Sequence, residues 1–281
     1  MTGVAGRSNG GRRGAEAAST SGSVITSPPH PRASITVVIP CFNEEQGLPR
    51  VLDRIPPEVD EVLVLDNHST DGTADVASRS GDRVRIVHHP TNLGYGGSYL
   101  RGLPMAKGDV IVTADGDGTY PVQECLSLVE ALVEGGYDFL SCTRFPLHDP
   151  RCMSPRNRFG NWLLNLLVNL FYGLRLRDAQ SGMWVIRKSA LDELRLSSRG
   201  MAFSNEIKIE AFRNPRVKAA EVHIPYAERI GKSKLYPMRD GVKMVLFLAR
   251  RRLLGPGPGG WSAPSAQVRA PVGVSSNGRE R

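Results

Sequence analysis

Residues 110–121 read VIVTADGDGTYP. Four apolar or β-branched residues, Val110–Thr113, open this stretch and predict a short buried strand. Asp115 and Asp117 follow the strand, separated by a glycine that lets the backbone bend. Two carboxylates in this position can ligate one hard cation, Mg²⁺ or Mn²⁺, which would bridge to a diphosphate. An ordinary Asp-Gly turn is the alternative, and the rest of the sequence has to decide between the two.

Three further runs of the same kind precede this one, and stretches with helical spacing of apolar residues alternate with the four runs. Such alternation predicts an α/β fold, a mostly parallel sheet with helices on both faces. In these sheets ligands bind beyond the carboxyl ends of the strands. The predicted strands are Ile35–Ile39, Glu61–Leu65, Val84–Val87 and Val110–Thr113, and the predicted helices are Glu45–Arg54, Thr73–Arg79, Gly96–Met105 and Val122–Glu134.

Polar or glycine-rich segments follow all four strands, at the expected ligand-binding edge. Asp66 ends a buried strand, where a carboxylate costs free energy unless it accepts hydrogen bonds; a ribose or a base edge would donate them. Asn43 is suited to cap a helix, and Asp71 is suited to cap the helix that starts near Thr73. The glycine-rich turn that begins at Asn92 suits close approach of the backbone to an anion.

The formal charge of +8 is concentrated at the two ends of the 281-residue chain. Residues 1–33 contribute +3 and residues 255–281 contribute +2, which leaves a mildly basic middle. We therefore expect no nucleic-acid partner. Both ends are rich in small, polar or proline residues and are expected to be disordered, which leaves residues 34–254 as the folded domain.

The four cysteines lie at no metal-binding spacing, and the first residues form no apolar signal segment. A reduced, cytoplasmic protein is therefore expected. No run reaches the roughly 18–20 apolar residues that cross a bilayer. If the substrate is a membrane lipid, we expect peripheral contact from the cytoplasmic face.

Four segments, VVIPCFNEE (37–45), LVLDNHSTDGT (63–73), NLGYGGSYLRG (92–102) and ADGDGTYP (114–121), occur in this order. Together they resemble the inverting family 2 glycosyltransferases, which have the GT-A fold, and within that family the polyprenyl-phosphate sugar synthases. The resemblance covers about residues 34–253. It implies a UDP- or GDP-sugar donor, with Mg²⁺ or Mn²⁺ held by Asp115 and Asp117. Thr119 is a departure, because relatives often have a metal-ligating glutamine there.

The resemblance also assigns roles within two halves, residues 34–143 for the nucleotide sugar and residues 144–254 for the acceptor. Asp66 would contact the base or the ribose. The segment RIGKSKL (229–235) resembles a late family element that closes over the diphosphate. Donor binding is thus expected of Pro40, Asn43, Glu44, Asp66, Asn92, Gly94, Asp115, Arg229 and Lys234.

Residues 144–161 contain four arginines and one acid. The guanidinium fork matches phosphate oxygens, so this cluster suits an acceptor that carries a phosphate. The resemblance places acceptor-phosphate ligands at Arg144, Arg156 and Asn161. A solvated basic loop is the alternative.

Asn157, Asn161, Asn165 and Asn169 recur every four residues and would form a polar stripe on one helix. Apolar residues cover most of its remaining surface, so the helix either packs inside the domain, which we favour, or lies on a bilayer. A second amphipathic stretch, Val242–Leu254, ends in three arginines. These suit either an anionic membrane or the C-terminus of a helix.

The nature of the acceptor decides whether a catalytic base is needed. A hydroxyl must lose a proton as it attacks, whereas a phosphomonoester, with a second pKa of about 6, is already ionised at pH 7. For a hydroxyl acceptor, Asp178 or Glu206 is the candidate base. We expect inverting transfer of a hexose to a polyprenyl phosphate, with Asp115 and Asp117 as the central catalytic residues. The alternatives are a soluble transferase that acts on a small-molecule or saccharide hydroxyl, and a non-enzymatic module that binds nucleotide sugars.

Overall fold

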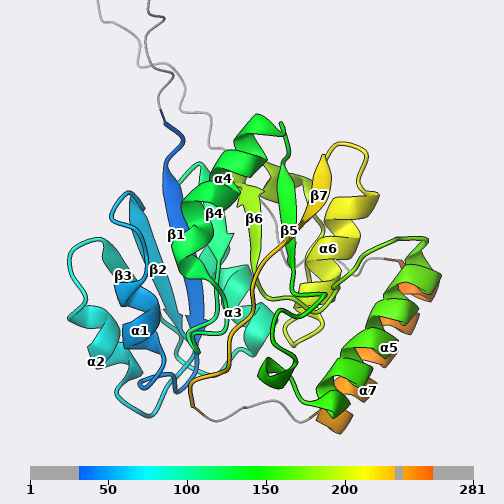
Figure 1. Ribbon diagram of the computed structural model, residues 1–281, viewed down its shortest axis with the longest axis horizontal. Coiled ribbons are helices and arrows are strands. Elements are labelled where there is room, and N and C mark those ends of the chain that lie inside the picture. The colour runs from blue at the N-terminus through cyan, green and yellow to red at the C-terminus, as the bar shows by residue number, and fades with distance from the viewer. Residues whose placement is uncertain (1–31, 232–236, 256–281) are drawn as a thin grey trace, which may run out of the picture. The chain divides into compact units, whose positions relative to one another are not determined.

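The computed structural model describes residues 32–231 and 237–255. Nearly all of the two ends that are expected to be disordered lie outside this range. A seven-stranded sheet, in the order β3-β2-β1-β4-β6-β5-β7, forms the centre of the domain (Figure 1). The strands are β1 (Ile35–Cys41), β2 (Glu61–Asp66), β3 (Val84–His88), β4 (Val110–Thr113), β5 (Phe139–Thr143), β6 (Trp184–Arg187) and β7 (Ala219–His223).

The predicted mostly parallel sheet is confirmed. β1 pairs in parallel with β2 and β4, and β2 pairs in parallel with β3, so the carboxyl ends of the four predicted strands reach one edge. β6 runs antiparallel between β4 and β5, and β7 is parallel to β5. Pro40 lies inside β1 rather than after it. Because β4 pairs with β1 only as far as Val38, a residue without an N–H is tolerated there.

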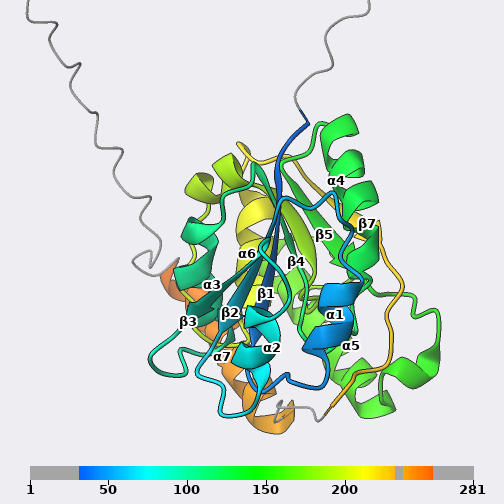
Figure 2. The ribbon, with the colours of Figure 1, turned by 90° about the vertical axis from the view of Figure 1, so that its left-hand side faces the viewer.

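Helices cover both faces of the sheet (Figures 1 and 2). Alternate strand residues point to opposite faces, so Val37 and Ile39 pack with α1, α2 and α4, while Val38 packs with α3 and α6. The helices are α1 (Leu48–Asp53), α2 (Thr73–Ser78), α3 (Tyr95–Gly102), α4 (Cys125–Glu134), α5 (Pro155–Tyr172), α6 (Phe203–Arg213) and α7 (Pro237–Leu254), with short 3-10 helices at Leu103–Met105, Val122–Glu124, Pro150–Cys152 and Lys188–Glu193.

α5 and α7 lie side by side at one end of the sheet and pack on α6 (Figure 1). Val168 and Tyr172 of α5, Ile209 of α6 and Leu248 of α7 form their shared core. No helix within the described residues is long and apolar enough to cross a membrane.

The asparagine stripe of α5 faces the protein at Asn165 and Asn169, whereas Asn157 at its start is exposed. Nδ2 of both Asn165 and Asn169 donates to the carbonyl oxygen of Leu176 at 2.8 Å, and Asn165 Oδ1 accepts from the backbone N–H of Ala179. The opposite, apolar side of the helix is therefore left uncovered. The favoured expectation that α5 is buried in the domain is wrong for this side, where Phe159, Trp162, Leu163, Leu166 and Leu170 are exposed.

Candidate active site

A cavity of about 250 Å³ opens at the carboxyl edge of the sheet. Both acids of the DGDG turn line it, together with residues from the ends of β1, β2 and β5. The structure therefore brings together segments that are far apart in the sequence. Of the predicted site residues, Pro40, Glu44, Asn92, Asp115, Asp117, Arg144 and Arg229 line this pocket.

Asp117 is buried, and its two carboxylate oxygens have different partners. Oδ1 accepts from the backbone N–H of Thr119 at 3.0 Å and from the Thr119 hydroxyl at 2.7 Å. Oδ2 lies 2.5 Å from Nη2 of Arg229. Thr119, the residue that departs from the family pattern, thus fixes the orientation of the carboxylate. Oδ2, the oxygen that would ligate a divalent cation, is paired with Arg229 in this structure.

Asp115 is set into the pocket wall beside Asp117. Burial, with repulsion from Asp117 as the second cause, raises the pKa of Asp115 to about 7. Tyr95 Oη lies 3.4 Å from its Oδ1. A side chain at Gly182 would crowd this site, because a Cβ there would lie 3.2 Å from Asp115 Oδ2.

This acid pair fits a divalent cation. A buried carboxylate beside a second one, as Asp115 is, is stabilised by a positive charge between the two, and Mg²⁺ is often held by one or two carboxylates plus substrate phosphates. Within the described residues no group of three or more His, Cys, Asp or Glu side chains could hold a metal ion. The remaining ligands would therefore come from a diphosphate and water.

The loop after β1 is bonded to the loop after β2. Asn43, which has a positive φ of 56°, accepts from the backbone N–H of Thr70 at 2.8 Å, and the backbone N–H of Glu44 donates to the Thr73 hydroxyl. Asn43 therefore holds two loops together and caps no helix; it does not line the pocket. The N-cap of α2 is Gly72 and not Asp71, although Asp71 Oδ1 accepts from the backbone N–H of Thr73.

Asp66 finds its hydrogen-bond donors within the protein. Oδ1 accepts from the backbone N–H of Ser69, and Oδ2 lies 3.0 Å from His88 Nδ1. Its neighbour Asn67 lines the pocket instead and donates to Asn92 Oδ1. Gly94 lies outside the lining. It has a φ of 79°, and a Cβ there would meet the Arg199 carbonyl oxygen at 2.5 Å.

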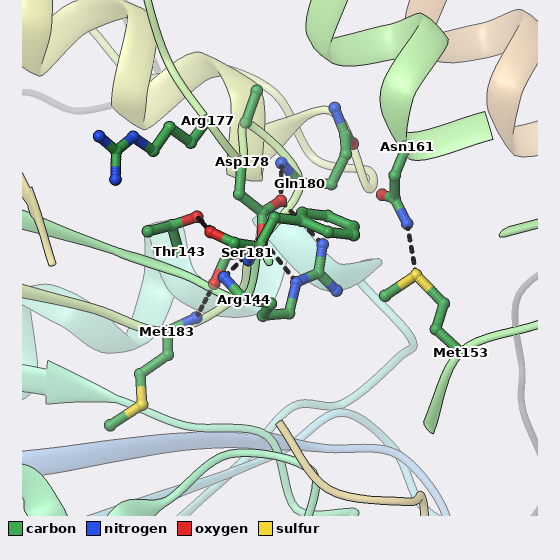
Figure 3. Close-up of polar contacts among 12 residues, drawn as sticks. Thr143, Arg144, Met153, Asn161, Arg177, Asp178, Gln180, Ser181 and Met183 are labelled. Carbon is green, nitrogen blue, oxygen red and sulfur yellow. Dashed lines mark hydrogen bonds and ion pairs between the residues drawn. The ribbon is translucent and has the colours of Figure 1, made fainter. Parts of the chain in front are cut away.

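Arg144, which also lines the pocket, forms a two-pronged ion pair with Asp178 (Figure 3). Nε and Nη2 of Arg144 donate to the two oxygens of Asp178 at 2.7 and 2.9 Å. The guanidinium also lies over the ring of Tyr226, 5.1 Å from its centroid. These contacts fix Arg144 so that Nη1 is the end of the fork not committed to Asp178.

Neither candidate base is in a position to act as one. Burial alone would raise the pKa of Asp178, but the ion pair with Arg144 outweighs it, and the pKa is lowered. Glu206 is fully buried outside the pocket lining and accepts from Ser197, Ser198 and Arg251. We therefore correct both assignments: Asp178 orients Arg144, and Glu206 anchors α7 to α6.

The other predicted residues lie away from the pocket or outside the described range. Arg156 is exposed at the start of α5. Asn161 Nδ2 lies 3.2 Å from Met153 Sδ (Figure 3). Lys234 is among the residues that the structure does not describe. Arg229 is fixed over the acid pair, because the next N–H, that of Ile230, donates to the Asp117 carbonyl oxygen.

Several lining residues were not predicted. Most of them lie within or beside one of the quoted motifs, and this position in the sequence could have identified them. Their uncharged side chains gave no separate indication of a role in binding. Ser204 and Met201 have no such position in the sequence. The unpredicted residues include Asn67, Tyr95, Ser98, Tyr120, Gln180, Met201, Ser204 and Tyr226.

The sheet is mostly parallel, and the pocket at its carboxyl edge is lined by the acid pair together with Arg144 and Arg229. This combination is typical of a glycosyltransferase of the GT-A class. Residues 36–195 match the model of the glycosyl transferase family 2, and the chain belongs to this family.

Similar proteins come from archaea and bacteria. The low-salt glycan biosynthesis hexosyltransferase Agl6 of Haloferax volcanii is 33% identical over 76% of this chain, which spans only 53% of that relative. A dolichyl-phosphate hexose transferase of the same organism is 33% identical over 74% of this chain and 89% of its own length. Among solved structures, glucosyl-3-phosphoglycerate synthase from Mycobacterium tuberculosis, in complex with Mn²⁺, UDP-glucose and phosphoglyceric acid, has a TM-score of 0.61 at 26% identity, with 80% of this chain and 82% of that one covered.

Proposed function

We propose that this protein transfers a hexose from a nucleoside-diphosphate sugar to a polyprenyl phosphate, with inversion at the anomeric carbon. The observation that carries the proposal is a pocket lined both by the acid pair and by Arg144, whose guanidinium is clamped by Asp178. The first suits a metal-bound diphosphate, and the second suits an anionic acceptor. The similarity to a dolichyl-phosphate hexose transferase supports the same acceptor class.

The chemistry needs no base from the protein. An oxygen of the ionised acceptor phosphate attacks the anomeric carbon, and the bond to the nucleoside diphosphate breaks with its electron pair on the leaving phosphate. Asp115 and Asp117 would hold Mg²⁺ or Mn²⁺, which when bound stabilises the charge on that phosphate. Arg229 adds a fixed positive charge beside Asp117 and Glu44. Arg144 orients the attacking phosphate.

Transfer to a hydroxyl is the second candidate. Its support is the similarity to a synthase whose structure holds UDP-glucose and phosphoglyceric acid. A hydroxyl acceptor needs a base within hydrogen-bond reach. Within the described residues, the carboxylates that line the pocket are Glu44, Asp115 and Asp117, all on the donor side. The phosphate acceptor therefore agrees better with the site.

One assay separates the two candidates. Purified protein is incubated with radiolabelled UDP- or GDP-sugars, Mg²⁺ or Mn²⁺, and either a polyprenyl phosphate or water-soluble acceptors that include phosphoglyceric acid. Label that moves into the organic extract supports the proposed function. Label that stays in the aqueous phase on an added acceptor contradicts it and supports the second candidate, and no transfer from any donor contradicts both.

The uncovered side of α5 supports peripheral binding to the cytoplasmic face of a membrane. Val242 and Leu246 of α7 add to the exposed apolar residues of α5, and Phe159 stacks on Trp162 with 5.8 Å between ring centroids. Aromatic pairs of this kind favour the membrane–water interface. Arg239, Lys243 and Arg250 are exposed on α7 as well. Such residues favour an anionic lipid surface.

Replacing Trp162 and Leu166 together by Gln is expected to weaken binding to anionic lipid vesicles by about a hundredfold. Each side chain loses roughly 1.5 kcal/mol or more of apolar burial in the bilayer. Co-sedimentation with vesicles measures the effect. The control is Met105→Gln, which alters an exposed apolar residue outside the helix pair. Equal binding by the double variant and the control would contradict the membrane contact.

A further inference from the structure

Lys208 is a buried cation that the proposed reaction does not use. It lies on α6 between Ile207 and Ile209, and none of the three is exposed by more than 1%. Its ammonium donates to two backbone carbonyl oxygens, those of Asp178 at 2.9 Å and Ser181 at 2.7 Å. Burial lowers the pKa of Lys208 to about 8. A leucine or methionine would fill this position without the cost of removing a charge from water.

The two carbonyls belong to the turn 178–182, which forms the acceptor side of the pocket. Asp178 holds Arg144 from this turn, and Gln180 and Gly182 line the pocket directly. A second contact stabilises the turn, because the backbone N–H of Gly182 donates to Tyr120 Oη at 2.6 Å. Lys208 binds the same turn from α6, through the two carbonyl oxygens.

The charges around the turn explain why a cation is needed there. The Arg144–Asp178 pair is neutral as a unit, and a neutral pair attracts a phosphate only weakly. Lys208 adds a second positive charge beneath the pocket floor, which balances Glu221, so that without Lys208 the group of four would carry a net negative charge. Glu221 on β7 opposes it; this half-buried carboxylate accepts from the backbone N–H groups of Arg177 and Asp178.

We infer that Lys208 is a positioning residue for the acceptor, which holds the turn 178–182 in place and keeps the charges beneath the acceptor site from becoming negative overall. This inference rests on the proposed function, because it requires an anionic acceptor. It concerns the KM for the acceptor and leaves the binding of the nucleotide sugar unaffected.

Two substitutions with opposite changes of charge test the inference. Lys208→Gln is expected to raise the KM for a polyprenyl phosphate in detergent about tenfold, the size expected for one unit charge several ångströms away at an effective protein dielectric constant. Glu221→Gln, which removes the opposing charge, is expected to lower this KM. The dissociation constant for the nucleotide measured by calorimetry should stay the same in both. If the two substitutions acted only by distorting the turn, and not through their charge, the acceptor KM would rise in both variants.

The wild-type protein supplies a test that needs no substitution. Titratable groups near the ammonium are Arg144, Asp178, Glu221 and Cys142, and burial raises the pKa of the Cys142 thiol to about 12. Above pH of about 8, Lys208 loses its proton, so the acceptor KM should rise between about pH 7 and pH 9.5, where the acceptor phosphate is fully ionised. Lys208→Gln should lack this rise.

The outcomes separate the inference from the proposed function. Turnover by wild type with a flat acceptor KM over this pH range, or an unchanged KM in Lys208→Gln, overturns the inference alone. If Lys208→Gln fails to fold, the wild-type pH profile and Glu221→Gln decide. If wild type transfers sugar to no phosphate acceptor, the proposed function and the inference both fall.

Discussion

Asp117→Asn is expected to reduce sugar transfer by about a thousandfold, which corresponds to the several kcal/mol that a bound cation supplies to a leaving phosphate. The substituted amide still accepts from Thr119 through Oδ1, so the turn should keep its shape. What disappears is the negative charge at Oδ2, the position that faces Arg229 and would face the metal. The loss should therefore appear in turnover and in metal binding while the fold is retained.

Initial rates with saturating donor and Mn²⁺ measure the first effect, and paramagnetic resonance of bound Mn²⁺ measures the second. Asp75→Asn is the matched control, because it makes the same chemical change at an exposed position on α2. The control should keep wild-type rates. An Asp117→Asn protein that transfers sugar within tenfold of wild type would remove the role assigned to this carboxylate.

Arg144→Lys is expected to lower kcat/KM for the acceptor by roughly a hundredfold, because a lysine cannot both hold Asp178 and present a second donor to a phosphate. The charge is kept, so the loss reports the geometry of the guanidinium fork. The affinity for the nucleotide should change little, since the Arg144 fork is paired with Asp178 and not with Asp115 or Asp117.

Arg151→Lys is the control for this experiment. Arg151 belongs to the same basic segment but is exposed and pairs only with Asp149. Its substitution should leave kcat/KM unchanged for both substrates. Should the two variants behave alike, Arg144 would have no special part in acceptor binding.

The sequence was sufficient to predict the first four strands. Val110–Thr113 matches β4 to the residue, and the predicted bounds of β1, β2 and β3 differ by one or two residues at the C-terminal end. Short β-branched runs bounded by turn residues have few other stable arrangements. The direction of a strand could not be predicted in the same way. β6 (Trp184–Arg187) has a composition that suits either direction, and its antiparallel pairing with β4 and β5 depends on long-range contacts.

The side-chain partners of residues 144–254 were harder to predict, because they too depend on contacts between residues far apart in the sequence. The sequence shows Asp178 as a carboxylate but not that Arg144, 34 residues earlier, takes both of its oxygens. Glu206 fails as a base in the same way, through Arg251, which lies 45 residues later. Of the two alternatives for the Arg250–Arg252 run, the membrane contact does not hold for Arg251, whose partners are the buried Glu206 and the partly buried Glu210 of α6.

The most direct test of the account is titration calorimetry of UDP and GDP, with and without Mn²⁺. The acid pair predicts that one nucleotide binds at least about tenfold more tightly when the ion is present, because the cation links two carboxylates to the diphosphate. Equal affinity in the presence of a chelator, or no binding of either nucleotide with the ion, would contradict the role of Asp115 and Asp117 on which both the mechanism and the acceptor argument depend.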